Sequence, residues 1–206
     1  MENKKNKKKN KKIRKGTKAK EVTAIYFDGS NFYHKLKDLK IFNTANFDYS
    51  GFAKWLARKR KIISNRYYVG VIRADKNDKK GQSLRANQQK LFARLKRKEF
   101  CIKGGYLMQN EGKYHEKGTD VKIAVDLLAG AYEDYYDSAI LISSDTDLIP
   151  AIKKIRQLGK RVEYIGFAHK PSFGMQAHVT LSRLLIKDEL MRFSAKGFSG
   201  RKKKKK

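Results

Sequence analysis

Four aspartates that lie next to predicted turns are the side chains whose types and spacing could do chemistry in this sequence. They are Asp28, Asp120, Asp145 and Asp147, and the last two are separated by a single residue. Carboxylate oxygens are preferred ligands of Mg²⁺ and Mn²⁺, and such ions polarise phosphodiesters and activate bound water. The aspartates therefore indicate a site where a divalent cation is held against a phosphodiester.

The predicted elements bring three of these aspartates to one edge of a sheet. The β-rich run at 22–27 ends directly before Asp28, and the apolar run at 138–143 ends shortly before Asp145. Asp120 begins a helix that leads back into the second of these strands. In parallel sheets, ligands bind beyond the carboxyl ends of the strands where the strand order reverses. If the two strands are neighbours, the three carboxylates converge.

Alternating strand and helix patterns predict an α/β fold with a mostly parallel, five-stranded sheet. The strands are expected at residues 22–27, 66–73, 100–108, 138–143 and 161–166. Helices are expected from about residue 46 and at about 82–98, 119–128, 147–158 and 175–184, with 185–186 adding an edge. Residues 109–117 are typical of a polar loop or a small hairpin.

The formal charge of +30 is divided between the ends of the chain and its centre. Residues 1–20 carry +10, residues 201–206 carry +6, and residues 21–200 keep +14. Like-charge repulsion and low hydrophobicity predict disordered basic tails at 1–20 and 188–206 around one domain at 21–187. Solubility alone is the alternative explanation of the tails. Because the centre is basic too, we expect nucleic acid as the partner, with non-specific polyanion binding by the tails.

Cysteine content and hydropathy limit where the chain functions. Cys101 is the only cysteine, which excludes an internal disulfide and a thiolate zinc site and suits a reducing compartment. The apolar run at 22–27 is too short for a signal peptide or a membrane span. We therefore expect a cytoplasmic protein without a membrane segment, and the sequence allows a homodimer without specifying one.

Helix capping is the competing interpretation of each aspartate, because Asp after a strand is a common N-cap. Asp147 precedes Pro150 and would start a helix in that interpretation. Asp126 lies about 9 Å further along its helix than Asp120 and is turned away from it, so a supporting or structural role is expected. The neutral groups that could orient ligands or water are Asn31, Ser143 and Ser144.

Basic side chains near the same edge are candidates for holding phosphates. They are Arg73, Lys117, Lys122 and the lysines of the 76–80 loop, and such contacts position a strand without reading its sequence. Phe32, Tyr33 and Tyr114 are aromatic residues that could stack on bases, with core or surface packing as the alternative.

Three motifs in this order resemble the NYN domain, in particular the LabA-like (DUF88) branch of the PIN-like nuclease superfamily. They are Tyr-Phe-Asp-Gly-Ser-Asn at 26–31, Glu-Lys-Gly-Thr-Asp-Val at 116–121 with Asp-Leu-Leu at 126–128, and Ser-Ser-Asp-Thr-Asp-Leu-Ile-Pro at 143–150 with Leu-Gly-Lys-Arg-Val at 158–162. The resemblance covers roughly residues 21–187. It implies a PIN-like Rossmannoid fold, which is a three-layer sandwich, and Mg²⁺- or Mn²⁺-dependent cleavage of RNA.

The resemblance also implies roles for individual residues. Asp28, Asp120 and Asp145 would bind the metal, Asp147 would bind it or orient water, and Asn31 would support Asp28. The sequence departs from the family where the third motif often reads Ser-Gly-Asp-Gly-Asp, because Ser144 and Thr146 replace the glycines. The acids are intact, so this departure bears on loop freedom and substrate access.

The leading hypothesis is therefore a metal-dependent ribonuclease, an endonuclease, that hydrolyses the phosphodiesters of single-stranded or structured RNA. The alternative is a non-catalytic RNA-binding module whose aspartates are structural or degenerate. Phosphatase or phosphotransfer chemistry on an α/β sheet would want a second Asp two residues after Asp28. Position 30 is Ser, so that pattern is absent.

Overall fold

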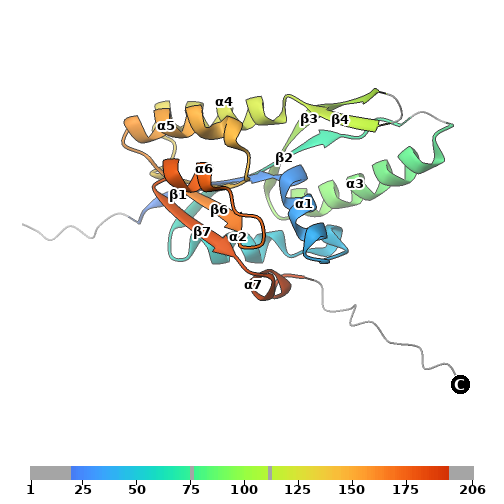
Figure 1. The fold of residues 1–206 in the computed structure, drawn as a ribbon, viewed down its shortest axis with the longest axis horizontal. Helices are drawn as coiled ribbons and strands as arrows, with labels where there is room; N and C mark the ends of the chain where they lie inside the picture. Colours follow the sequence, from blue (N-terminus) through green and yellow to red (C-terminus); the bar gives the residue numbers. More distant parts are fainter. Residues whose placement is uncertain (1–19, 75–76, 111–112, 195–206) are drawn as a thin grey trace, which may run out of the picture.

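A seven-stranded sheet forms the centre of the structure, a computed structural model that describes residues 20–74, 77–110 and 113–194 (Figure 1). The strand order is β4-β3-β2-β1-β5-β6-β7. Every neighbouring pair is parallel except β3 and β4. The strands are β1 (Val22–Asp28), β2 (Lys61–Val71), β3 (Phe100–Asn110), β4 (Lys113–Lys117), β5 (Ser138–Ile142), β6 (Arg161–Phe167) and β7 (Leu181–Leu185).

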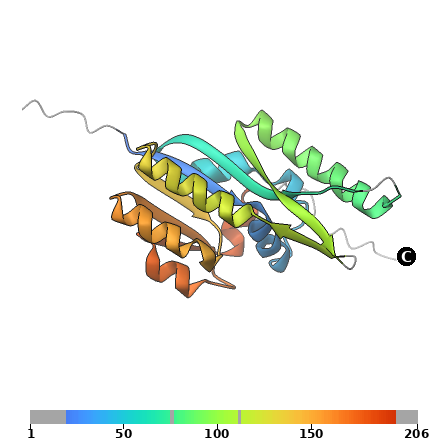
Figure 2. The same ribbon diagram turned by 90° about the horizontal axis from the view of Figure 1, so that it is seen from above.

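Helices cover both faces of the sheet and complete three layers (Figures 1 and 2). One face carries α1 (Gly29–Asp38), α2 (Tyr49–Ala57), α3 (Lys79–Arg97) and α7 (Lys187–Met191), with the 3₁₀ turn η1 (Thr44–Asn46) between α1 and α2. The other carries α4 (Thr119–Tyr132), the 3₁₀ turn η2 (Thr146–Leu148), α5 (Ile149–Gln157) and α6 (Phe173–His178). No helix in the described part of the chain is long and apolar enough to cross a membrane.

Two cores, one on each face of the sheet, hold these layers together. On the α1 and α2 face, Phe27 of β1 contacts a cluster of aromatic rings that includes Phe32, Tyr49, Phe52 and Phe100. These five rings are almost completely buried. Burying a Phe side chain contributes about 1.5–3 kcal/mol, so this cluster fixes the position of α1 and α2 against the end of β1.

The prediction of five strands is wrong, because β4 and β7 add one strand at each edge of the sheet. β4 is a short, charged edge strand that pairs with β3, and charge is a common protection of sheet edges. Its polar composition hides the pairing from a hydrophobicity pattern. β7 occupies residues for which the sequence predicts the end of a helix, whereas α6 ends at His178.

The helix α1 lies where the sequence analysis assigns no element. Its first residues, Gly29, Ser30 and Asn31, are poor helix formers. Burial of Phe32 and Leu36 on one side of the helix supplies the stabilisation that propensity lacks. Tertiary packing therefore decides the structure of the segment that follows Asp28.

The chain packs as far as Phe193, after α7. The Phe193 ring contacts the rings of Phe47, Phe52 and Trp55, and its carbonyl accepts a hydrogen bond from the Asp48 backbone at 2.8 Å. The predicted basic tails lie largely outside the described residues.

The strand order reverses between β1 and β5. From β1 the chain builds outward through β2 and β3, and it returns to the opposite side of β1 with β5. Parallel pairing places Phe27 beside Ile142, so Asp28 and Ser143 emerge together at the carboxyl edge of the sheet. On the other side, Asp28 is level with Tyr68 of β2. The strands that precede Asp28 and Asp145 are therefore neighbours, which is the condition for their carboxylates to converge.

Candidate functional site

Asp28 occupies the centre of this carboxyl edge and is 4% exposed. Its Oδ1 accepts a hydrogen bond from the Asn31 backbone N–H at 3.0 Å, so the carboxylate caps α1. Its Oδ2 accepts a hydrogen bond from the Ser143 hydroxyl at 2.7 Å. Capping and a place at the candidate site are thus properties of the same residue rather than alternatives.

Gly29 allows the chain to turn directly after Asp28. A Cβ atom at this position would lie 2.5 Å from the Tyr67 ring and 2.7 Å from the Tyr68 carbonyl oxygen. The backbone at residue 29 therefore passes against β2 at a distance that only glycine tolerates. This close approach keeps the start of α1 over the end of the sheet.

Asp120 reaches the same edge from the first turn of α4. Gly118 precedes the helix with φ of 79°, a conformation that suits glycine, and it has no side chain with which to cap α4. The negative charge of Asp120 is favourable at the positive end of the helix dipole. Asp120 is only partly buried, so its carboxylate remains accessible.

Asp145 and Asp147 lie in the turn that follows β5. The Asp145 Oδ1 accepts a hydrogen bond from the Asp147 backbone N–H at 2.9 Å, which caps η2. The Asp145 backbone N–H donates to the Ser143 hydroxyl oxygen at 3.2 Å. Ser143 thus connects the Asp145 turn with Asp28. Asp147 itself is exposed.

Asn31 and Ser144 link neighbouring loops around the acids. The Asn31 Oδ1 accepts a hydrogen bond from the Ser144 backbone N–H at 3.3 Å, which joins α1 to the turn after β5. The Ser144 hydroxyl lies 3.1 Å from the Tyr164 hydroxyl of β6. The Ser144 side chain is therefore held toward β6.

Electrostatic coupling shows that the carboxylates share one environment. Burial raises the pKa of Asp28 to about 6, and the charges of Asp120 and Glu116 add to the increase, while the bonds from Asn31 and Ser143 oppose it. Partial burial also raises the pKa of Asp120, and the charges of Asp145, Glu116 and Asp147 raise it further. Like charges disfavour joint ionisation, so this edge gains stability from a positive charge.

Glu116 is a fifth acid at this edge that the sequence analysis does not assign to the site. It lies on β4, and its carboxylate accepts hydrogen bonds from the hydroxyls of Ser30 and Thr119. It therefore connects the first turns of α1 and α4. Its place four residues before Asp120, in the quoted motif, is a signal that could have identified it.

Asp126, one helical turn and a half beyond Asp120, points into a different set of contacts. Its carboxylate accepts a hydrogen bond from the Tyr68 hydroxyl at 2.7 Å and pairs with Arg66 at 3.1 Å and Lys103 at 3.7 Å. These contacts bind α4 to β2 and β3. The Asp126 carboxylate is thus engaged by a tyrosine and two basic side chains that hold α4 against the sheet.

The predicted phosphate-holding residues differ in their surroundings. The Lys122 ammonium donates to the Gly104 carbonyl and lies over the Tyr106 ring, 5.3 Å from its centroid. Arg73 and Lys117 are exposed and form no side-chain hydrogen bond or salt bridge within the described residues. Arg73 and Lys117 are therefore the freer of the three for phosphate contact.

The aromatic residues that could stack on bases also differ in their exposure. Phe32 is completely buried in the core and cannot stack on a base, which confirms core packing for this residue. Tyr33 is half-exposed beside His34. Tyr114 lies among residues whose side chains are outside the described set.

The donor chemistry of this edge suits a hard divalent cation, because five carboxylates supply oxygen ligands. Within the described residues, however, no three His, Cys, Asp or Glu side chains lie close enough together to hold one ion. Asp28 also uses both of its oxygens as acceptors. Ion binding at this edge therefore requires the carboxylates to approach one another.

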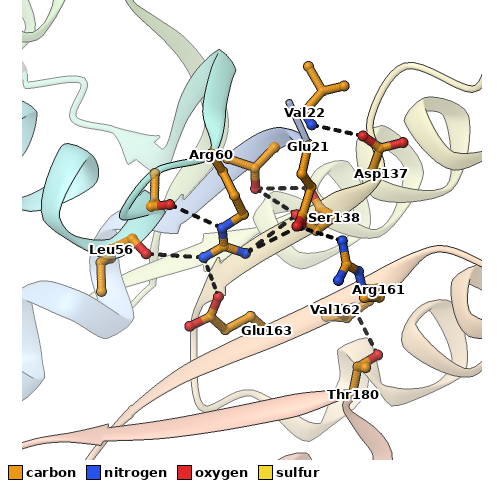
Figure 3. Close-up of polar contacts among 12 residues, drawn as sticks. Glu21, Val22, Leu56, Arg60, Asp137, Ser138, Arg161, Val162, Glu163 and Thr180 are labelled. Carbon is orange, nitrogen blue, oxygen red and sulfur yellow. Dashed lines mark hydrogen bonds and ion pairs between the residues drawn. The ribbon is translucent and has the colours of Figure 1, made fainter. Parts of the chain in front are cut away.

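A cavity of about 570 Å³ opens at the opposite, amino edge of the sheet. Two of its arginines are paired with acids: Arg60 pairs with Glu163 and Glu21, and Arg161 pairs with Glu21 at 2.7 Å (Figure 3). Arg60 also donates to the carbonyls of Leu56 and Ala57 in the last turn of α2, each at 3.1 Å. Glu21 and Glu163 are thus paired with arginines at the amino edge, whereas no salt bridge among the described residues involves the acids of the carboxyl edge.

Comparison with known proteins adds a family and a fold. The NYN domain matches residues 22–181, which include all five acids of the carboxyl edge. The structure is similar to the crystal structure of a protein of unknown function, VPA0982, from Vibrio parahaemolyticus RIMD 2210633, with a TM-score of 0.63. The two are 24% identical, and the likeness covers 84% of this chain and 97% of that one. No curated protein matches the sequence.

Proposed function

The chain belongs to the NYN domain family, a PIN-like nuclease family, and on this premise we propose that it is a metal-dependent endoribonuclease. The convergence of carboxylates from β1, α4 and the turn after β5 on one edge of a basic protein carries the proposal. Burial raises the pKa values of Asp28 and Asp120, and the charges of the neighbouring acids raise them further. A divalent cation relieves that repulsion and suits a phosphodiester substrate.

Asp28, Asp120 and Asp145 are the residues that would hold Mg²⁺ or Mn²⁺, and Asp147 would bind the ion or orient water. When bound, such an ion polarises the phosphoryl group and lowers the pKa of a coordinated water. Ser143 orients both Asp28 and the Asp145 turn through its hydroxyl. Glu116 sets the spacing between the starts of α1 and α4.

RNA is the proposed substrate. Arg73 and Lys117 would hold its phosphates beside the acids, with Lys122 as a further contact once it leaves the Gly104 carbonyl. Such contacts fix the register of a strand and supply no base recognition. We therefore expect cleavage with little sequence preference.

Replacement of Asp145 by Asn tests the proposal most directly. We expect the Asp145→Asn variant to lose cleavage by roughly 100-fold or more, since the loss of metal-ion catalysis is worth several kcal/mol. RNA affinity should stay almost unchanged, because phosphate contacts come from the basic residues. Both are measured with labelled RNA, as Mn²⁺-dependent cleavage and as binding in EDTA.

The control is Asp134→Asn, which removes an exposed aspartate at the other end of α4 and should leave cleavage and binding intact. An equal loss of cleavage and binding in Asp145→Asn would contradict the assignment of Asp145 to a metal site.

A non-catalytic RNA-binding module is the second candidate function. It is favoured by the spacing of the acids, since no three metal-binding side chains of the described chain are gathered for one ion. Ser144 and Thr146, in place of the small residues that this turn often has, would also restrict its closure. Retention of RNA binding without Mn²⁺-dependent cleavage in the unmodified protein would select this candidate.

A further inference from the structure

The helix α3 carries charge of one sign along its whole length. Its charged residues are Lys79, Lys80, Arg85, Lys90, Arg94, Lys96 and Arg97, and it contains no Asp or Glu. All seven are exposed, and within the described residues none of them forms a salt bridge. The helix is therefore an uncompensated positive ridge about 28 Å long.

Helix stability does not explain this composition. Lys79 and Lys80 lie in the first turn, where the helix dipole disfavours positive charge. The acid beside them, the N-cap Asp78, accepts a hydrogen bond from the Gly81 backbone N–H at 2.8 Å and stands against seven basic residues in the helix. Lys90 and Arg94 form a like-charged pair four residues apart, which is also unfavourable. Only Arg94, Lys96 and Arg97, in the last turn, are placed as the dipole prefers.

The position of α3 relates this ridge to the acidic edge. In the middle of the helix, the Gln88 side chain donates to the Gly70 carbonyl at 2.8 Å and accepts from the Ile72 backbone N–H at 2.9 Å. Gly70, in β2, and Ile72, directly after it, already lie past Tyr68, which is level with Asp28. The helix therefore crosses the carboxyl edge near its midpoint.

The first half of α3 projects beyond that edge. Its first nine residues extend about 13 Å past the level of Gln88. Figures 1 and 2 both show α3 reaching further past the sheet than the start of α1 or of α4. Lys79, Lys80 and Arg85 thus stand outside the acidic edge, on the same end of the molecule.

We propose that α3 is the surface that binds the RNA strand whose phosphodiester lies at the acidic edge. This inference rests on the proposed function and extends it to the substrate, which would be an RNA strand long enough to lie on both α3 and the acidic edge. Phosphates of the strand replace the missing acidic partners of α3, and their binding releases condensed counterions. The contacts are to the backbone, so they add affinity and orientation without sequence preference.

The proposal predicts a dependence on RNA length. A strand of three or four nucleotides occupies the acidic edge without reaching the projecting half of α3. A longer strand gains the contacts of Lys79, Lys80 and Arg85. Removal of these charges should therefore weaken the binding of long substrates more than that of short ones.

The test variant combines Lys79→Gln, Lys80→Gln and Arg85→Gln, and the matched control combines Lys54→Gln, Lys153→Gln and Lys154→Gln. Both remove three positive charges from exposed helical positions on the same protein. Binding of a 20-nucleotide RNA is measured in EDTA in the Asp145→Asn background, as a function of salt. Cleavage of the same RNA and of a tetranucleotide is measured with Mn²⁺ in the otherwise unmodified protein.

We expect the α3 variant to bind the long RNA about 10- to 100-fold more weakly at 0.1 M salt, with a salt slope smaller by about 2. The control should change binding far less, and in the α3 variant cleavage of the tetranucleotide should fall much less than cleavage of the 20-nucleotide RNA. The melting temperature of the α3 variant should equal or exceed that of the parent, because unfavourable first-turn charges are removed. Loss of binding is then separable from unfolding.

Equal loss in the α3 and control variants would mean that binding follows net charge alone, and it would overturn the proposal. Unchanged binding in the α3 variant would overturn it as well. Neither result would affect the proposed function, which is judged by cleavage in the unmodified protein and in Asp145→Asn. Conversely, an α3-dependent affinity in a protein that does not cleave RNA would refute the catalytic assignment alone.

Discussion

At the residue scale, Asp28 is the clearest case of a side chain whose ionised form lowers the stability of the folded protein. A carboxylate that is 4% exposed, with Asp120 and Glu116 near it, is less easily ionised than the same group in water. Its two hydrogen bonds reduce this penalty without removing it. Such an arrangement is common at functional sites, where a ligand supplies the missing charge.

The pH dependence of stability tests this reading of Asp28. Because its pKa in the folded protein, about 6, lies above its ordinary value of 3.8, the stability contributed by the neutral form is lost as pH rises through 6. Asn mimics the neutral form. We expect Asp28→Asn to raise the free energy of unfolding by about 1 kcal/mol at pH 4.5 and about 3 kcal/mol at pH 8.

Urea denaturation across this pH range, in EDTA, measures the difference between Asp28→Asn and the parent. The exposed Asp134→Asn serves as the comparison and should show no such trend. A difference that is constant with pH would contradict the raised pKa of Asp28.

At the element scale, β4 matters more than its length suggests. It pairs with β3 at one edge of the sheet, and Glu116 on this strand joins the beginnings of α1 and α4. Both helices begin with residues adjacent to a candidate ligand, Asp28 or Asp120. The strand therefore sets the distance between two of the carboxylates.

Replacement of Glu116 by Ala should expose this role. Two hydroxyl groups lose their carboxylate acceptor, and we expect the free energy of unfolding to fall by about 1–3 kcal/mol. The pKa of Asp28 should also fall, because Glu116 contributes to its increase. Chemical denaturation and a carbon-13 NMR titration of the Asp28 carboxyl measure the two effects.

Glu133→Ala, at the C-terminal end of α4, is the control for Glu116→Ala and should change neither quantity appreciably. An unchanged Asp28 titration together with unchanged stability would show that Glu116 does not couple the two helices.

At the scale of the whole molecule, acids and bases are segregated. The carboxyl edge gathers acids from β1, β4, α4 and the turn after β5, while α3 beside it is purely basic. At the amino edge, by contrast, Arg60 pairs with Glu163 and Arg161 pairs with Glu21 (Figure 3). The molecule therefore has one end at which a cation and a polyanion can both be bound.

Metal addition should stabilise the whole domain through this end. At a Mn²⁺ concentration 100 times the dissociation constant, we expect about 2.7 kcal/mol of added stability, or roughly 5–10 °C in melting temperature. EDTA should reverse the shift, and Asp28→Asn should reduce it. A thermal melt that does not respond to Mn²⁺ would favour the non-catalytic RNA-binding module.

The sequence by itself determined the parts that depend on local pattern. Apolar runs that end in Asp28 and shortly before Asp145 predicted two central strands and the edge on which they end. The Gly118-Thr119-Asp120 turn predicted the start of α4. These predictions held because each rests on the few residues around one strand end or helix start, and buried parallel strands have a strong apolar signature.

Only the tertiary structure decided which elements pair and what surrounds them. Edge strands β4 and β7 have weak hydrophobic patterns, and α1 forms through packing of Phe32 and Leu36 rather than through propensity. The neighbours of Glu116 and Asp126 depend on contacts with β2, β3, α1 and α4, which no local pattern encodes. The projection of α3 past the acidic edge likewise follows from where Gln88 contacts β2. Such relations arise when distant segments share one sheet, so sequence spacing does not reveal them.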